Sequence, residues 1–317
     1  MDLVSDVHPM TITSGDGLAL TGVRRGTGLA AATVVYVHGL LSDASYWEPV
    51  TACLHDRLGG EIAQIVYDQR GHGNSDRPHR SAETTLEDLA DDLDVVLAQA
   101  TGSVVLVTHS AGSLVAAAYV RRYPARAAAL SGLILFNGTG EFPEFPALPR
   151  QFRAIATRLK NLRHSRFDHL AAVCAVVAEQ RFRRTARRLG SRAPLVAGAR
   201  AGDPRVLTDV MAAYREFHLD ADIAARMRSL PSFVVTGDRD RVVPAEQSMR
   251  LAAKIWADFQ IVSGVGHSLP HSNPDTAADV IVAALDIAYR SDLRELLIER
   301  DDDTGDRDWV TETDGAP

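Results

Sequence analysis

The sequence lacks the features that would tie it to a membrane, to secretion or to a disulfide framework. Its two cysteines, Cys53 and Cys174, are too few for a disulfide-rich fold or a cysteine-rich zinc site, and we expect both to be free thiols. No run approaches the roughly 18 apolar residues that a membrane-spanning helix needs. The start, MDLVSDVHPM, has neither the basic nor the apolar region of a secretory signal, so we expect a cytoplasmic protein.

Several chemical motifs are also missing. The chain has no GxGxxG pattern, no Walker loop and no HExxH pair, so nothing in it predicts a nucleotide cofactor or a zinc centre, and we expect neither cofactor nor metal. Aromatic residues make up only 6% of the chain and the formal net charge is −7. Nucleic acid is therefore not an expected partner.

What is present is an ordinary globular composition with a lopsided distribution of charge. The chain has 317 residues, of which 46% are hydrophobic, which suits one large domain with an insertion. Residues 150–230 carry 17 basic side chains against 7 acidic ones, whereas residues 291–317 carry 10 acidic side chains against 3 basic ones. We expect the acidic segment 291–317 to be a disordered tail.

Continuous apolar runs alternate with helical patterns along most of the chain. After a predicted hairpin at 10–25, four such runs, each followed by a turn or a helix, lie before residue 140, and the rhythm resumes after Pro231. This alternation predicts an α/β fold whose mostly parallel sheet is buried on both faces by helices. Between the two parts, residues 141–230 begin with a proline-rich stretch and then show only helical patterns. The predicted domains are a discontinuous core (1–140 and 231–290), a helical insertion (141–230) and the tail (291–317).

The sequence THSAG at 108–112 lies where an apolar run ends and a helix begins. A serine on such a tight strand-to-helix turn projects its hydroxyl above the sheet edge, so Ser110 is the candidate nucleophile. The N–H of Ala111, at the start of the helix, then points to where an oxyanion would form. The competing interpretation of Ser110 is a helix N-cap.

A nucleophilic serine needs a base and an acid that orients it. His267 lies between glycines just after the last predicted strand and is the candidate base. The acid comes from TGDRDRVVP at 236–244, where Asp240 is favoured over Asp238, whose alternative role is to cap the loop.

The second oxyanion donor is expected in VHGLL at 37–41, where Gly39 lets the chain turn and Leu40 offers its N–H. His38 in the same segment is expected to be structural. His38, Gly39 and His109 are nevertheless candidates for the wall of the substrate pocket, together with Phe145 and Phe152 of the insertion.

Five motifs in this order, VHGLLSDASYW, YDQRGHGNSDRP, VTHSAGS, TGDRDRVVP and GVGHS, resemble those of serine hydrolases with the α/β-hydrolase fold. The resemblance covers about residues 10–140 and 230–290. It implies Ser110 as nucleophile, Asp240 as acid and His267 as base, with the Leu40 and Ala111 amides as oxyanion hole and 141–230 as a cap. The branch with the most similar motifs contains lactonases, esterases and cofactor-free haloperoxidases. Thr108 and Ser113 depart from the family because glycine is common at both positions.

The resemblance implies hydrolysis of a carboxylic ester, which includes lipid esters, thioesters and lactones. Four other reactions on the same residues stay open, namely C–C bond hydrolysis, acyl transfer, amide cleavage and perhydrolysis, and so does a non-catalytic ligand receptor of this fold. The arginine-rich stretch of the cap suggests attraction to anionic or lipid-like substrates, or peripheral contact with a membrane surface. Its arginines are Arg181, Arg183, Arg184, Arg187 and Arg188.

Overall fold

The computed structural model of the chain describes residues 7–79, 82–142 and 202–303. Within these residues eight strands form one sheet in the order β1-β2-β4-β3-β5-β6-β7-β8. β2 runs antiparallel to both of its neighbours, and the remaining pairs are parallel. The predicted α/β class and mostly parallel sheet are confirmed. The strands are β1 (Val7–Thr13), β2 (Ala19–Arg25), β3 (Ala32–Val37), β4 (Ala63–Tyr67), β5 (Ser103–His109), β6 (Gly132–Phe136), β7 (Ser232–Gly237) and β8 (Asp258–Val262).

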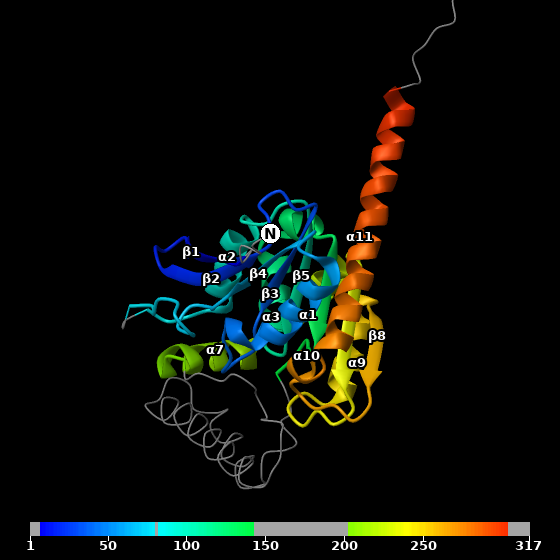
Figure 1. Cartoon of the computed structure of the whole chain (residues 1–317). Helices are drawn as coiled ribbons and strands as arrows, with labels where there is room; N and C mark the ends of the chain where they lie inside the picture. The colour runs from blue at the N-terminus through cyan, green and yellow to red at the C-terminus, as the bar shows by residue number, and fades with distance from the viewer. Residues whose placement is uncertain (1–6, 80–81, 143–201, 304–317) are drawn as a thin grey trace, which may run out of the picture.

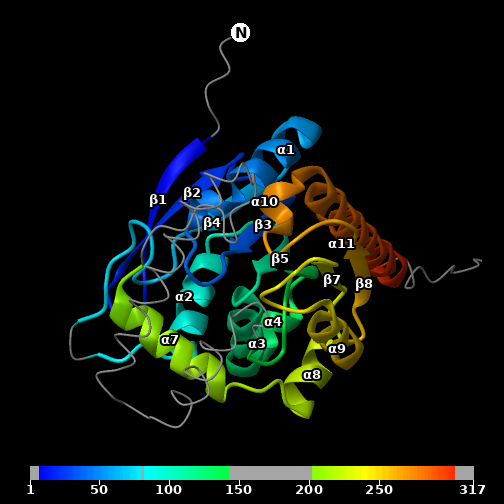
Figure 2. The ribbon, with the colours of Figure 1, turned by 90° about the horizontal axis from the view of Figure 1, so that it is seen from below.

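Helices cover both faces of the sheet (Figures 1 and 2). α1, α10 and α11 lie on one face, and α2, α3, α8 and α9 lie on the other, with α7 beside α2. The described helices are η1 (Ala44–Trp47, a 3₁₀ turn), α1 (Glu48–Leu58), α2 (Leu86–Leu97), α3 (Gly112–Arg122), α4 (Pro124–Ala128), α7 (Pro204–Glu216), α8 (Ala221–Met227), α9 (Ala245–Ile255), α10 (Leu269–Ser272) and α11 (Pro274–Asp303).

Each face of the sheet has its own hydrophobic core. On the central strand β5, Val105 and Val107 pack on the side of α1 and α11, whereas Leu106 between them packs on the side of α2 and α3. All three side chains are fully buried. Because both faces are covered, β5 reads as a continuous apolar run rather than an alternating one, which is why its strand is evident in the sequence.

The first hairpin and the second helix are defined by local polar contacts. The turn between β1 and β2 closes through Ser14 N–H to the carbonyl of Leu18 at 2.9 Å, with Gly17 in the left-handed region at φ 89°. α2 begins with a capping box in which Thr85 and Asp88 bind each other's backbone N–H.

Of the segment 141–230 that is predicted to be a helical cap, the structure describes residues 141–142 and 202–230. The second of these stretches contains the helices α7 and α8. Val210 of α7 and Ile223 of α8 are buried in the same core cluster as residues of α2 and α3. The boundaries of the cap stay a prediction because residues 143–201 lie outside the described part of the chain.

The C-terminal helix is longer than the sequence suggested. α11 continues to Asp303 and extends past the rest of the described elements, so the first 13 residues of the predicted tail are helical (Figure 1). Neither glycine nor proline occurs between Asp275 and Thr304, and leucine, glutamate and arginine are good helix formers. In the part of the chain that the structure describes, no helix has the length and apolarity required to cross a membrane.

Candidate active site

The connections that leave one edge of the sheet carry the predicted site residues. β3, β5, β6 and β7 are parallel neighbours, so their carboxyl ends meet at the same edge. Binding sites of open α/β sheets form at this edge. Ser110 follows β5, Asp240 follows β7 and His267 follows β8.

Ser110 lies in a strained turn between β5 and α3. Its φ is 53°, in the left-handed region that residues with a β-carbon seldom adopt, at a cost of about 1–3 kcal/mol. Its N–H donates to the carbonyl of Phe136 at 2.9 Å, which fastens the turn to the end of β6. Contacts with neighbouring residues thus hold the turn in its strained conformation, which fixes the orientation of the Ser110 side chain.

The turn is also crowded. A β-carbon on Gly112 would lie 2.9 Å from the carbonyl oxygen of Val37, and one on Gly39 would lie 3.1 Å from the β-carbon of Ser110. Both glycines let the loop after β3 approach the serine closely. The tight strand-to-helix turn therefore requires glycine at both positions for steric reasons.

The two departures from the family pattern fit the structure. Thr108 is fully buried, and its hydroxyl lies 3.4 Å from the carbonyl of Ile134. The Ser113 hydroxyl accepts the N–H of Thr139 at 3.0 Å and lies 2.7 Å from the carbonyl of Ser110, to which it can donate. Ser113 thus connects the serine turn to the chain that leaves β6.

His267 joins Ser110 to Asp240. The Ser110 hydroxyl lies 2.9 Å from Nε2 of His267, and Nδ1 of His267 lies 2.8 Å from Oδ2 of Asp240. Because a carboxylate only accepts hydrogen bonds, Nδ1 carries the proton, which leaves Nε2 to accept the hydroxyl proton of Ser110. The three residues, separated by 130 and 27 positions in the sequence, form one continuous chain of hydrogen bonds.

Asp240 rather than Asp238 contacts the histidine. The Asp238 carboxylate accepts the N–H of Gly264 at 2.7 Å and closes the loop, which is the alternative role considered for it from the sequence. The side chain of Asp240 has no exposed surface. Its Oδ1 accepts the N–H groups of Val242 and Val243 at 2.8 and 3.0 Å.

Asn137 also contacts Asp240, and the sequence patterns did not predict it. This residue directly follows β6, and its amide Nδ2 donates to Oδ2 of Asp240 at 2.8 Å. A polar residue that follows a buried strand at the carboxyl edge is a weak signal that could have marked it. Its partner, 103 positions later in the chain, could not have been read from the sequence.

Burial keeps His38 beside the site in its neutral form. Nε2 of His38 accepts the N–H of Gln69 at 3.1 Å and Nδ1 lies 2.8 Å from the carbonyl of Gly39, so Nδ1 carries the proton. Burial lowers the pKa of His38 to about 4. The ring has no exposed surface and is fully engaged by the backbone, in keeping with the structural role expected for it rather than with a place in a pocket wall.

His109 supports the loop that carries His267. Its Nε2 lies 2.8 Å from the carbonyl oxygen of His267, to which it donates, and its ring stacks on Tyr46 at 4.5 Å between centroids. Burial lowers the pKa of His109 well below its usual value, and the neighbouring His267 adds to this effect. His109 is 1% exposed, so its ring supports the site from within the core and does not line an open pocket.

The two predicted oxyanion donors keep their N–H groups available. Neither the Leu40 N–H nor the Ala111 N–H donates a hydrogen bond to any group within the described residues. Leu41 next to Leu40 has φ 61°, so this loop, like the serine turn, contains a left-handed residue. Buried or half-buried donors without acceptors are the groups that an anion would satisfy.

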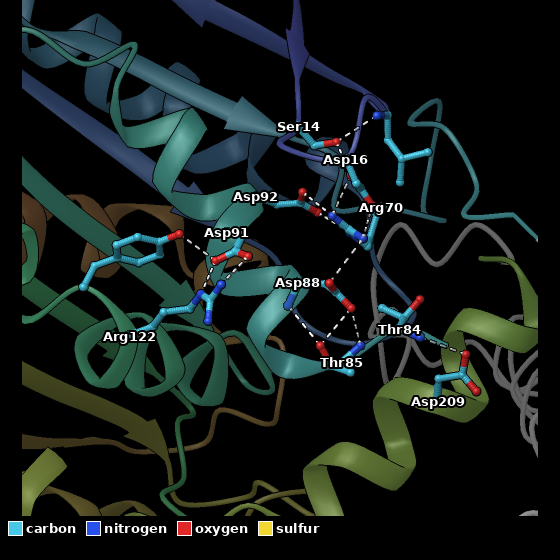
Figure 3. Close-up of polar contacts among 12 residues, drawn as sticks. Ser14, Asp16, Arg70, Thr84, Thr85, Asp88, Asp91, Asp92, Arg122 and Asp209 are labelled. Atoms are coloured by element: carbon cyan, nitrogen blue, oxygen red, sulfur yellow. Dashed lines mark hydrogen bonds and ion pairs between the residues drawn. The ribbon is translucent and has the colours of Figure 1, made fainter. Parts of the chain in front are cut away.

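The DQRGHGNSD loop at 68–76 is held by side-chain hydrogen bonds to its surroundings. Asp68 accepts the N–H groups of Ala44 and Asn74 at 2.7 and 2.8 Å. Arg70 forms two hydrogen bonds with Asp92 of α2, at 2.6 and 2.7 Å, and two with Asp16 in the first hairpin, at 3.0 and 3.3 Å (Figure 3). The loop is thereby tied to the hairpin and to α2.

Some predicted residues lie outside the described part of the chain. They are the pocket candidates Phe145 and Phe152, together with the arginine-rich stretch 181–188 on which the expectation of anionic or membrane partners depends. Among the described residues, no cluster of histidine, cysteine, aspartate or glutamate side chains is suited to hold a metal ion.

Comparisons with known proteins agree with the fold. A model of the alpha/beta hydrolase family matches residues 34–280. A curated protein of Caulobacter segnis, provisionally assigned as the carbamate hydrolase RutD, is 29% identical over 257 residues, which cover 80% of this chain and 91% of that protein.

Solved structures of the same fold are also similar. A thermophilic esterase from Thermogutta terrifontis is 26% identical with a TM-score of 0.62, covering 89% of this chain and 99% of the esterase. The enol-lactonase from Burkholderia xenovorans LB400, at 19% identity, a TM-score of 0.60 and a coverage of 87% and 100%, shows the same fold. Because the family model spans most of the chain, the protein belongs to the alpha/beta hydrolase family.

Proposed function

We propose that the protein is a serine hydrolase that cleaves carboxylic esters through an acyl-enzyme. The observation that carries this proposal is the hydrogen-bond chain from Ser110 through His267 to Asp240, with contacts of 2.9 and 2.8 Å. In this arrangement the serine is activated by an adjacent base, and the base is oriented by a buried carboxylate.

The reaction proceeds in two halves. Oγ of Ser110 attacks the acyl carbon while Nε2 of His267 takes the hydroxyl proton, and His267 then returns that proton to the departing alkoxide, which leaves as an alcohol. Water next attacks the acyl-enzyme with His267 again as base. The acid is released and the Ser110 hydroxyl is restored.

Charge develops at two places during each half. The carbonyl oxygen of the substrate becomes an oxyanion, for which the N–H groups of Leu40 and Ala111 are the available donors, and losing one such donor typically costs about 3–4 kcal/mol of transition-state stabilisation. The imidazole of His267 becomes an imidazolium, which the adjacent Asp240 carboxylate stabilises.

Ester hydrolysis is preferred because the esterase of Thermogutta terrifontis combines 26% identity with almost complete coverage of both chains. Lipid esters, thioesters and lactones belong to the same class, since each presents an acyl carbon with an oxygen or sulfur leaving group. The second candidate is a carbamate, which the similarity to the Caulobacter proteins supports. Attack of Ser110 on a carbamate would form a carbamoyl-enzyme on the same residues.

Labelling with a fluorophosphonate and turnover of p-nitrophenyl esters of increasing chain length test the proposal. We expect the wild-type protein to be labelled and to release p-nitrophenol, and Ser110→Ala to do neither. Ser248→Ala, which removes another buried hydroxyl that binds the carbonyl of Gly138 at 2.8 Å, serves as a matched control and should behave as wild type.

Matched p-nitrophenyl esters and N-alkyl carbamates then separate the two candidates by kcat/KM. Product analysis with added alcohol or peroxide would reveal acyl transfer or perhydrolysis, and turnover of a β-diketone would reveal C–C hydrolysis. Ligand binding that survives Ser110→Ala, with no labelling of the folded wild-type protein, would overturn the proposal in favour of a receptor.

A further inference from the structure

Asn137 combines two unfavourable features in one buried residue. It has no exposed surface, and its φ is 49°, in the left-handed region. Its backbone N–H donates to the carbonyl of Val235 at 2.8 Å, so the residue is fixed between the ends of β6 and β7. Strained backbone at the carboxyl edge of such a sheet invites a functional explanation.

The side chain of Asn137 points at the oxygen that the histidine uses. Nδ2 of Asn137 and Nδ1 of His267 both lie 2.8 Å from Oδ2 of Asp240. With the backbone N–H groups of Val242 and Val243 on Oδ1, the Asp240 carboxylate accepts four hydrogen bonds. This number matches the lone-pair sites of a carboxylate, so every direction around Asp240 is defined by a donor.

The orientation of the Asn137 amide is itself informative. Its Oδ1 is buried without a hydrogen-bond partner among the described residues, a condition that destabilises a folded protein. The reverse orientation would place Oδ1 against the Asp240 carboxylate, with two acceptors facing each other. The hydrogen bond from Nδ2 to Asp240 is therefore kept even though Oδ1 of Asn137 makes none.

We propose that Asn137 is a positioning residue that holds Oδ2 of Asp240 toward Nδ1 of His267. By donating to the carboxylate it also disperses part of the negative charge, so that the proton shared by Asp240 and His267 stays on the imidazole. This inference depends on the proposed function of Ser110 and His267, and it adds a fourth residue to their assembly.

Two side chains from other elements lie close to the pair and stay neutral. His109 from β5 packs against the His267 ring at 4.8 Å between centroids, and burial holds its pKa far below neutrality. Tyr46 from η1 also lies close, and burial, with the Asp240 charge as a smaller cause, raises the pKa of its hydroxyl. Neither side chain changes charge near pH 7, so a change at Asn137 is read out through Asp240 and His267.

The decisive variant is Asn137→Gly. Glycine adopts a positive φ without penalty, so if Asn137 serves only the backbone, this variant should equal or exceed the wild type in thermal stability and match its pH profile. If Asn137 positions Asp240, we expect kcat to fall about tenfold. The pH at half-maximal kcat/KM should rise by about half to one unit, because the less dispersed carboxylate charge favours the imidazolium.

Two further variants complete the series. Asn137→Asp keeps the size of the side chain and tolerates the left-handed backbone, and the added acidic group should raise the pH midpoint further than glycine does. Thr236→Val removes a buried hydroxyl 3.5 Å from the Asn137 amide without touching Asp240, and it should leave the midpoint unchanged. If Asn137→Gly does not fold, Asn137→Asp carries the test.

A second readout is independent of turnover. The proton on Nδ1 of His267 gives a far-downfield NMR resonance when it is shared with a carboxylate, and in Asn137→Gly we expect this resonance to shift or to be lost through exchange with water. An unchanged resonance and an unchanged pH midpoint would overturn the inference. Failure of the wild type to turn over any ester would instead count against the proposed function, while the resonance would still report on Asn137.

Discussion

The carboxylates of Asp92 and Asp240 both lack exposed surface, and their negative charges are compensated in opposite ways. Asp92 on α2 accepts two hydrogen bonds from the guanidinium of Arg70, so its negative charge is cancelled where it stands (Figure 3). Asp240 accepts four hydrogen bonds, and every one comes from a neutral group when His267 is neutral. Its charge is solvated but not cancelled.

The difference separates a structural carboxylate from a functional one. A carboxylate neutralised by arginine exerts little field on its surroundings, whereas a carboxylate held by amides keeps its charge available for a cation that forms only during the reaction. His267 is the side chain that can become that cation. Burial and hydrogen-bond count alone would not distinguish the two aspartates, but the charge of their donors does.

The largest effect on the contrast between Asp92 and Asp240 is expected for Asp240→Asn. The amide keeps the shape of the side chain but removes the charge and favours the wrong tautomer of His267, so we expect kcat for a p-nitrophenyl ester to fall on the order of 10⁴-fold. Thermal unfolding should move little because the packing is preserved. A loss of less than tenfold, in a protein shown by circular dichroism to be folded, would contradict the role given to Asp240.

The mirror-image experiment is Asp92→Asn. It leaves the buried Arg70 guanidinium without its main partner, so we expect the free energy of unfolding to fall by about 3–5 kcal/mol. Under conditions in which the variant stays folded, kcat/KM should be close to that of the wild type. Asp91→Asn, which breaks the exposed pair with Arg122, is the matched control and should leave the urea midpoint near wild type. A catalytic defect in Asp92→Asn equal to that of Asp240→Asn would erase the distinction.

Buried histidines extend the comparison to groups that are kept uncharged. Burial, with His38 as a second cause, lowers the pKa of His72 to about 4 from an ordinary value near 6.5. A lowered histidine pKa stabilises the folded state above pH 6.5, and this contribution is lost as the pH falls toward 4. The wild-type free energy of unfolding should therefore decline in this window.

Substitution of one histidine isolates its share of that decline. In His72→Gln the slope of unfolding free energy against pH should be smaller by about 1.4 kcal/mol per pH unit between pH 6.5 and 4. Urea titrations at half-unit steps of pH measure it. Parallel slopes for the two proteins would show that His72 takes up a proton equally well in the folded state.

The smallest effect is expected for Ser113→Ala. The substitution leaves the N–H of Thr139 without its acceptor inside the protein, which should cost about 1–3 kcal/mol of unfolding free energy and slow labelling of Ser110 only slightly. Ser229→Ala, whose exposed hydroxyl binds the carbonyl of Arg226, provides the surface comparison. An unfolding midpoint equal to that of Ser229→Ala would mean that the Ser113 hydroxyl does not stabilise the fold, although glycine is the common residue at this position.

Local patterns account for what could be predicted from the sequence. The turn of Ser110, the loop of His267 and the acidic loop after β7 each follow an apolar run within a few residues, and strand ends of a parallel sheet must meet. The sequence also narrowed the acid to Asp238 or Asp240, because both belong to the one short loop after β7. It favoured Asp240, which lies further into that loop. These are consequences of chain order.

Contacts between distant parts of the chain could not be predicted in the same way. Asn137 and Asp240 are joined only because β6 and β7 are neighbours, and Arg70 finds Asp92 only because α2 packs beside the loop. The acidic charge of residues 291–317 predicts disorder, but the residues up to Asp303 are helical. In that stretch the helix propensity of the residues has more influence than their net charge. Pattern reasoning therefore located the chemistry better than the contacts that support it.

The described residues on either side of 143–201 bear on how this protein could acquire new substrates. On one side, Gly140 accepts the N–H of Leu219, and on the other, Asp203 donates its N–H to the carbonyl of Gly71 at 2.7 Å. Both ends of the stretch 143–201 are thus fastened to the core by bonds that do not involve its own residues. An exchange of residues 143–201 therefore replaces no residue of these two bonds and none of the Ser110–His267–Asp240 chain, and a change of length between fixed ends adds only slowly to the entropic cost of closure.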